Sequence, residues 1–116
     1  NFVSTYSIIS SNPTLYDGTE MGNPVHYTIS KAGLWGLTKY IASNIREYGV
    51  LCNSIAPHGI ENNQGKEFKV NFSKRNPMGR LSNPSEVIPA IEFLLDEKNT
   101  YVNGSNIPVD GGWTAC

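Results

Sequence analysis

The sequence predicts an α/β fold, and three observations lead to this prediction. A segment that starts near Tyr27 repeats its apolar residues at helical intervals and stops at Gly49. The short apolar run 50–56 follows at once and lacks polar alternation. A second helical pattern begins at Asn83, and another short apolar run covers 106–109. Helices that alternate with strands buried on both faces are typical of a layered fold with parallel strands.

Length and composition limit the classes of protein to consider. A chain of 116 residues is at most one compact domain. Its 39% hydrophobic content is that of a globular protein, and a net charge of -1 gives no field that would attract nucleic acid or an anionic membrane. The sequence contains no apolar run of roughly 18 residues, and its first residues lack the charged and apolar stretches typical of a signal peptide. We therefore expect a cytoplasmic protein, with Cys52 and Cys116 as free thiols.

The first half of the chain is expected to contain a loop, a long helix and a strand. Residues 7–24 carry several turn signals, and a loop of this length is more often part of an active site than an idle connection. The helix extends from Tyr27 to Tyr48, before Gly49. The strand covers 50–56 and is closed by Pro57. The apolar face of the helix consists mainly of Leu34, Leu37, Ile41, Ala42 and Ile45.

The second half is expected to contain a polar stretch, a helix and a strand. Residues 58–80 are rich in Gly and Asn, and their basic side chains suit a solvated face better than a site for an anionic sugar or nucleotide. Asn83, Pro84 and Glu86 predict a helix start with a reciprocal cap, although Pro89 should bend or loosen the first turns. The strand 106–109 ends at Asp110-Gly111-Gly112. The basic side chains in question are Lys66, Lys69, Lys74 and Arg75.

Tyr27 and Lys31 form the most suggestive pair of polar side chains. Their spacing of four places both on one side of the helix, one turn apart. A free phenol is a poor base at neutral pH, but a neighbouring ammonium favours the phenolate and lowers the phenol pKa. Such a tyrosine can donate and accept a proton. A chain with six tyrosines meets this spacing by chance often enough that the pair alone is weak evidence.

Other segments accompany this pair in a fixed order. Ser4 ends a short first strand, the helix opens with Tyr-Thr-Ile-Ser-Lys-Ala-Gly, 53–59 reads Asn-Ser-Ile-Ala-Pro-His-Gly, and 109–112 reads Val-Asp-Gly-Gly. Over essentially its whole length the chain thereby resembles the catalytic half of the short-chain dehydrogenase/reductase family. The resemblance implies the C-terminal part of a Rossmann-like, doubly wound parallel sheet. The glycine-rich nucleotide-binding half is then expected ahead of Asn1, so the isolated chain should have little activity.

The resemblance also implies roles for individual residues. Tyr27 would exchange a proton with the substrate oxygen while hydride passes to or from NAD or NADP. Lys31 would hold the nicotinamide ribose, and Ser4 would hydrogen-bond the substrate oxygen. The turn that follows the predicted strand 50–56 would also contact the cofactor. In the family, a glycine usually occupies the position of His58 in this turn. The turn residues concerned are Pro57, Gly59 and Ile60, the last through its backbone. No metal site is expected.

The spacing between Ser4 and Tyr27 leaves other candidates for the serine of the site, and the inserted segment suggests a substrate class. Ser4 and Tyr27 are 23 positions apart, about ten more than is common in the family, so Ser7, Ser10 or Ser11 could compete with Ser4. Placement at a strand end favours Ser4. The insert and the Asp-Gly-Gly-Trp-Thr ending resemble oxidoreductases of flagellin-modification or surface-sugar clusters, which implies a sugar-like substrate. Tyr6 and Tyr16 either line a substrate pocket or pack the loop. The insert residues that carry this resemblance are Tyr16, Gly18, Thr19 and Met21.

Two other functions stay open at the level of sequence. The first is a noncatalytic interaction module derived from the same fold, whose long helix pairs with a partner through Trp35, Lys39 and Tyr40. The second is a sugar-nucleotide epimerase, which usually has a much longer C-terminal substrate domain. A homo-oligomer is expected whether the chain is catalytic or an interaction module. A glycine-rich segment encoded before Asn1 would favour the enzyme, and an authentic start there would favour the module.

Overall fold

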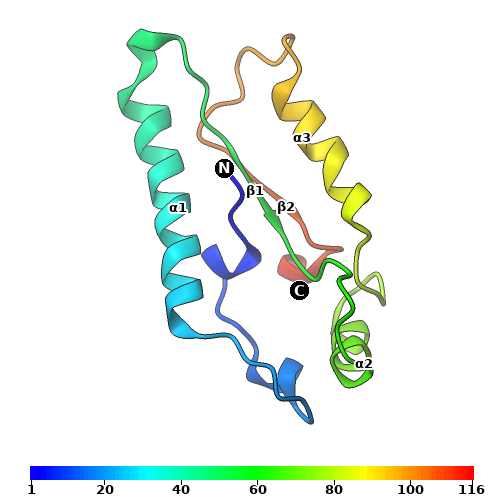
Figure 1. Ribbon diagram of the computed structural model, residues 1–116. Coiled ribbons are helices and arrows are strands. Elements are labelled where there is room, and N and C mark those ends of the chain that lie inside the picture. Colours follow the sequence, from blue (N-terminus) through cyan, green and yellow to red (C-terminus); the bar gives the residue numbers. More distant parts are fainter.

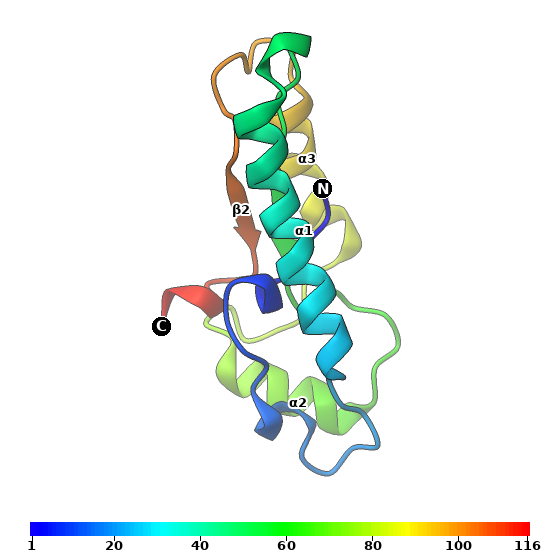
Figure 2. The same ribbon diagram turned by 90° about the vertical axis from the view of Figure 1, so that its left-hand side faces the viewer.

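The computed structural model describes residues 1–116, apart from the side chain of Arg46. Helix α1 (Val25–Asn44) and helix α3 (Ile88–Leu95) lie on opposite sides of the strands β1 (Ser54–Pro57) and β2 (Asn106–Val109) (Figure 1). Helix α2 (Lys66–Arg75) lies beyond one end of the strands, next to the segment that precedes α1 (Figure 2). The molecule is elongated, with extents of 51 × 27 × 25 Å.

The strands are parallel, as the sequence predicts. β1 pairs with β2 in a register that runs from Ser54 opposite Asn106 to Pro57 opposite Val109. The first residues of the chain pair with the other edge of β1, since Val3 N–H donates to the carbonyl of Ile55 at 2.9 Å. The Ser54–Ala56 side chains are buried, which agrees with a strand covered on both faces. The α/β prediction is confirmed.

The long helix is shorter than the prediction. α1 starts at Val25, two residues early, and ends at Asn44, four residues before Tyr48. Residues 46–48 form a 3-10 turn, and the chain reverses at Gly49 with φ of +67°. The Asn44 side chain bonds the carbonyl of Tyr40, and tightening of the last turn to 3-10 geometry is common at helix ends. The buried side chain of Thr38 accepts a hydrogen bond from Asn1, which fastens α1 to the first strand segment.

The predicted strand 50–56 also begins too early in the sequence. Val50 and Leu51 are exposed, and β1 begins only at Ser54. Side-chain amides take the place of sheet hydrogen bonds here: Asn103 accepts from the N–H of Cys52 at 2.8 Å, and Asn53 donates to the carbonyl of Val102 at 2.7 Å. Cys52 and Cys116 are free thiols, as expected.

Helix α2 was not predicted from the sequence, because it lies within the polar stretch 58–80. Only Phe68 and Phe72 are buried in this helix, and they are four residues apart on one side. These two rings form a core cluster with Leu15 and Leu81. A stripe of two apolar residues is too narrow to stand out as amphipathic, and packing stabilises the helix instead. Lys66 and Lys74 are exposed, as expected for a solvated face, whereas Lys69 pairs with Glu61 at 2.6 Å.

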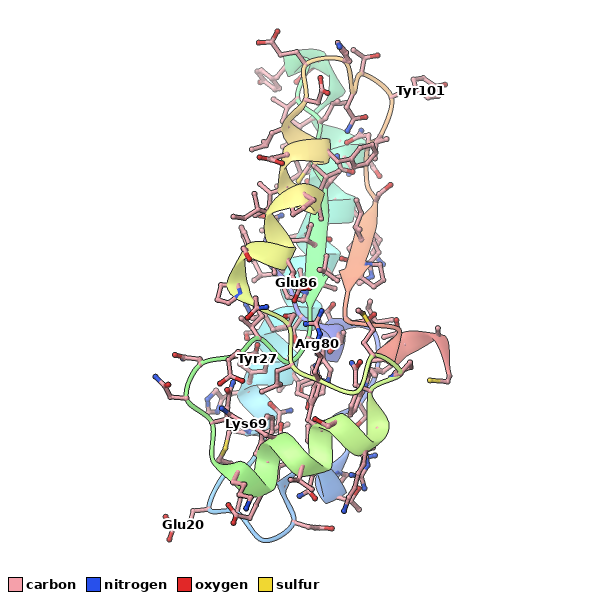
Figure 3. The ribbon with its side chains drawn as sticks, turned by 90° about the vertical axis from the view of Figure 1, so that its right-hand side faces the viewer. Glu20, Tyr27, Lys69, Arg80, Glu86 and Tyr101 are labelled. Atoms are coloured by element: carbon pink, nitrogen blue, oxygen red, sulfur yellow. The ribbon has the colours of Figure 1, made fainter. Side chains whose placement is uncertain are left out.

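The predicted start of the last helix is confirmed. The Glu86 carboxylate accepts from the N–H of Asn83 at 2.7 Å and also pairs with both terminal nitrogens of Arg80 (Figure 3). Its first turn is 3-10, and regular α3 begins at Ile88, so Pro89 falls in the first turn of α3, where it is tolerated. Among the described residues, no helix combines the length and the apolar character needed to cross a membrane.

Candidate functional site

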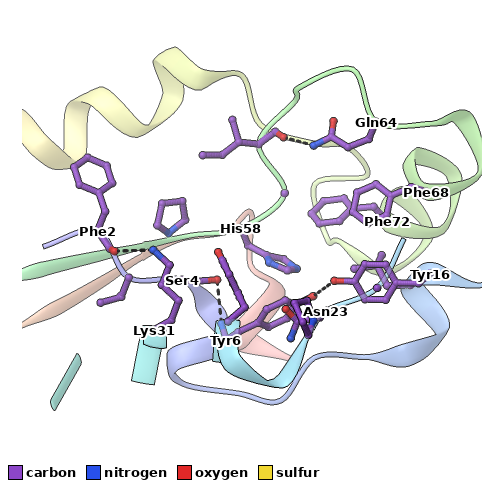
Figure 4. Close-up of a pocket in the computed structure, with 18 residues that line it drawn as sticks. Phe2, Ser4, Tyr6, Tyr16, Asn23, Lys31, His58, Gln64, Phe68 and Phe72 are labelled. Atoms are coloured by element: carbon purple, nitrogen blue, oxygen red, sulfur yellow. Dashed lines mark hydrogen bonds between the residues drawn. The ribbon is translucent and has the colours of Figure 1, made fainter. Parts of the chain in front are cut away.

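A cavity of about 480 Å³ lies where the first segment, the start of α1, the end of β1 and α2 come together (Figure 4). All residues that the sequence analysis proposes for catalysis or cofactor contact line this one cavity. They come from three separate stretches of the chain, so the fold rather than closeness in sequence brings them together. These residues are Ser4, Tyr27, Lys31, Pro57, Gly59 and Ile60.

Tyr27 and Lys31 occupy the first two turns of α1. The Lys31 ammonium lies 5.6 Å from the centre of the Tyr27 ring and donates to the backbone carbonyl of Phe2 at 3.1 Å. The Tyr27 side chain is 38% exposed, so a molecule in the cavity can reach it. The structure thus places a cation and a phenol next to one another on one wall, which is the arrangement needed for proton transfer.

Ser4 lies at the end of the segment that pairs with β1. It is buried, it precedes a 3-10 turn (Thr5–Ser7), and its Oγ accepts from the N–H of Tyr6 at 3.3 Å. Its hydroxyl proton therefore remains available to a ligand. Ser10 and Ser11 do not line the cavity, and Ser7 is occupied with the carbonyl of Ser4 at 2.6 Å. The geometry favours Ser4 over these three alternatives.

The turn after β1 requires glycine at residue 59 rather than at 58. Gly59 has φ of +58°, and a Cβ built on it would lie 2.1 Å from the Phe72 ring. His58 keeps a negative φ, so its side chain causes no backbone strain. Its N–H donates to the carbonyl of Val109 at 3.2 Å. In the described part of the chain, the N–H of Ile60 has no acceptor.

The buried residue His58 also lines the cavity. Its Nδ1 is 2.8 Å from Oγ1 of Thr5, and its ring lies 4.5 Å from the ring centre of Trp113 and 5.2 Å from that of Phe72. Burial lowers the pKa of His58 to about 4, while the Asp110 carboxylate acts in the opposite direction. His58 is therefore uncharged at neutral pH.

The lowered pKa predicts a loss of stability in mild acid. Above the ordinary value of 6.5, both folded and unfolded states keep the imidazole uncharged. As the pH falls from there towards about 4, the unfolded chain binds a proton that the folded chain does not, so stability decreases, in total by about 3 kcal/mol. Urea unfolding at about pH 7 and about pH 5 measures the effect. His58→Gln should flatten this pH dependence, whereas the exposed His26→Gln should retain it; equal slopes would contradict the assignment.

Several cavity residues were not identified from sequence as site residues. Phe68 and Phe72 reach it because α2 lies beside it, and Asn23 and Gln64 come from loops. The four-residue spacing of the two phenylalanines was the one signal available. Tyr6 and Tyr16, for which lining and packing were both open, do both. Their hydroxyls are 3.0 Å apart at the cavity, and the Tyr16 ring lies 5.9 Å from that of Phe68.

Comparisons with known proteins agree with this architecture. A family model described as enoyl-(acyl carrier protein) reductase matches residues 8–114. A 3-oxoacyl-[acyl-carrier-protein] reductase FabG of Aquifex aeolicus is 37% identical over 92 residues, which is 76% of this chain and 37% of the relative. An L-rhamnose 1-dehydrogenase (NAD(P)(+)) of Azotobacter vinelandii is 37% identical over 93 residues, which is 75% of this chain and 36% of the relative.

Solved structures extend the match to nearly every residue. The crystal structure of a short chain dehydrogenase from Leptospira borgpetersenii with bound NAD+ superposes with a TM-score of 0.87 at 36% identity, and the match covers 98% of this chain and 43% of that one. The chain thus spans about two fifths of the length of the proteins it matches. Because the family model, the curated relatives and the parallel α/β fold all agree, the chain belongs to the short-chain dehydrogenase/reductase family.

Proposed function

We propose that this chain supplies the proton-transfer site of an NAD(P)-dependent oxidoreductase that interconverts an alcohol and a carbonyl group on a sugar-like substrate. The observation that carries the proposal is the convergence of Ser4, Tyr27 and Lys31 on one cavity from separate parts of the chain. Each of the three has a different chemical task there.

In the direction of oxidation, the Tyr27 oxygen accepts the proton of the substrate hydroxyl, and in the direction of reduction it returns that proton to the carbonyl oxygen. The Ser4 hydroxyl donates a hydrogen bond to this substrate oxygen and so holds the substrate oxygen near Tyr27. Lys31 places a positive charge beside the Tyr27 ring, 5.6 Å from its centre and close to the atoms that react. A nicotinamide cofactor held beside these residues would supply or take up the hydride, and with it the two electrons, that accompany this proton transfer.

The residues present fit such a cofactor. The backbone N–H of Ile60 has no partner in the described chain, and Ile60 lines the same cavity as Lys31. A free N–H can bind the oxygen of a carboxamide, and an ammonium can bind ribose hydroxyls. The Leptospira structure contains NAD+, and the Azotobacter relative is named for both NAD and NADP, which supports a nicotinamide cofactor without choosing between the two.

A sugar-like substrate is supported by the relatives and by the cavity. The Azotobacter relative is named for a sugar, L-rhamnose. The cavity has the size of a small-molecule site and combines aromatic rings with hydroxyl and amide groups. Both features suit a small molecule with an apolar ring face and several oxygens.

The direct test uses the purified protein that contains this chain, titrated with NADH and with NADPH by fluorescence and then assayed with neutral aldoses in the presence of NAD+ or NADP+ as the hydride acceptor. We expect one or both cofactors to bind and at least one aldose to be oxidised. Lys31→Met should weaken cofactor binding at least about tenfold, because it removes a charge-assisted hydrogen bond worth roughly 1.5–3 kcal/mol. Lys39→Met is the matched control, since Lys39 lies over Trp35 further along α1. Failure to bind either dinucleotide would refute the proposal.

A further inference from the structure

Tyr6 and Tyr16 form a hydroxyl pair on the cavity wall next to the proposed proton-transfer site. The Tyr6 ring stands edge-on to the Tyr27 ring, with their centres 6.3 Å apart. Its hydroxyl is 3.0 Å from that of Tyr16, and both side chains line the cavity (Figure 4). A small molecule whose reacting oxygen meets Tyr27 therefore has other atoms within reach of this pair.

Hydrogen-bond accounting shows that the pair has a donor left over. Two phenols carry two O–H protons, and their mutual bond uses one of them. Neither hydroxyl has a second partner among the described residues. Burial and the bond to Tyr16 raise the pKa of Tyr6 far above its ordinary value, so Tyr6 keeps its proton. One O–H is thus available for an acceptor on a ligand.

The other polar groups of the cavity are largely committed within the protein. Gln64 uses its amide nitrogen on the carbonyl of Ile60 and its amide oxygen on the N–H of Asn62, both at 2.7 Å. Asn23 uses its amide nitrogen on Thr28 at 2.9 Å. Lys31 is the charged residue of the lining, and no Asp, Glu or Arg is among the described lining residues. A neutral ligand suits this wall better than an anionic or cationic one.

The position of Tyr16 is fixed before any ligand binds. Leu15, the preceding residue, is buried in the core cluster with Phe72. The Asn71 side chain of α2 donates to the carbonyl of Asp17 at 2.9 Å. Tyr16 is therefore held on both sides in sequence, and its hydroxyl needs little ordering when a substrate arrives.

We propose that the Tyr6–Tyr16 pair determines substrate specificity by donating a hydrogen bond to a second oxygen of a neutral, polyhydroxylated substrate. The inference rests on the proposed function and names the residues of that site which recognise the substrate class. The segment 7–24 contributes Tyr16, so this part of the chain acts in specificity rather than as a spacer.

The test compares a sugar with its own deoxy analogues. In the protein that contains this chain, kcat/KM is measured for the best neutral aldose and for each of its monodeoxy derivatives, with wild type and with Tyr16→Phe. For wild type, one analogue should lose roughly five- to thirtyfold in kcat/KM. For Tyr16→Phe, kcat/KM for the parent sugar should fall by that factor and become equal to kcat/KM for this analogue, because both changes remove the same contact. Tyr6→Phe should act in the same direction.

The controls separate this inference from the proposed function. Tyr101→Phe, at a residue that is 98% exposed, should leave all values unchanged. Equal losses for the parent sugar and every analogue in Tyr16→Phe, or no loss at all, would refute the specificity role while leaving the oxidoreductase assignment intact. Absence of turnover of every sugar by wild type, with cofactor present, would overturn the proposed function and this inference together.

Discussion

Replacing Tyr27 with phenylalanine is expected to lower turnover by a factor of about 10² to 10⁴ in the protein that contains this chain. General acid–base catalysis by one positioned side chain contributes an effect of this size. The ring packing against Tyr6 and Lys31 would remain, because only the hydroxyl is removed. Steady-state kcat and the dissociation constant of the nicotinamide cofactor, measured on the same preparation, separate chemistry from binding.

The matched control for this substitution lies on the same helix. Tyr40→Phe removes a hydroxyl from α1 at a residue that is 62% exposed and does not line the cavity. It should leave both kcat and cofactor binding unchanged. A Tyr27→Phe protein that keeps wild-type turnover would show that another group moves the proton.

Replacing Gly59 with alanine is expected to destabilise the protein by about 2–5 kcal/mol. A left-handed backbone costs a residue with a side chain roughly 1–2 kcal/mol, and inserting a methyl group into a packed site costs about 1–3 kcal/mol more. The new Cβ would overlap the ring of Phe72, which is itself fully buried. The ring or the turn must move, and both line the cavity.

Gly79→Ala separates the cost of the left-handed backbone from the cost of the clash with Phe72. Gly79 has φ of +69°, close to that of Gly59, but a Cβ there would meet no atom within 4 Å. It should show only the backbone cost of about 1–2 kcal/mol in urea unfolding. Equal losses for the two variants would mean that Phe72 accommodates the methyl group and that the turn does not depend on this close contact.

Local interactions explain which elements were predictable from sequence. The reciprocal cap between Asn83 and Glu86 involves residues three apart, and the strand 106–109 is bounded by its own Asp-Gly-Gly turn, so both follow from short segments. The parallel pairing of β1 with β2 agrees with the absence of polar alternation in the predicted strand. The first two depend on contacts within a few residues, whereas the strand pairing joins residues about fifty positions apart and was predicted only from the apolar pattern of the strand.

Two of the errors, the start of β1 and the missed helix α2, have a common origin in long-range contacts. The start of β1 is set by Asn103, about fifty residues away, which takes the N–H of Cys52 out of the sheet. Helix α2 depends on two rings packing against Leu15 and Leu81. The first arrangement leaves no periodic signal in its segment, and the second leaves only the four-residue spacing of Phe68 and Phe72.

In the candidate site, too, some residues could be predicted from the sequence and others could not. Tyr27, Lys31 and Ser4 could be named in advance through a family resemblance, and the structure brings them to one cavity, although their roles stay proposals. The bond between Tyr6 and Tyr16 could not be predicted, because it depends on how the segment between them folds against α2. The family resemblance identifies the residues proposed for catalysis, but it does not identify the two tyrosines proposed for substrate specificity.

The central claim is that Tyr27, with Ser4 and Lys31, holds the reacting oxygen of the substrate. A crystal structure of the protein that contains this chain, with a nicotinamide cofactor and an unreactive substrate analogue, tests it most directly. The claim predicts one analogue oxygen within about 2.6–3.2 Å of both the Tyr27 hydroxyl and the Ser4 hydroxyl, and Lys31 against the nicotinamide ribose. An analogue bound away from Tyr27, with the cofactor in place, would contradict it.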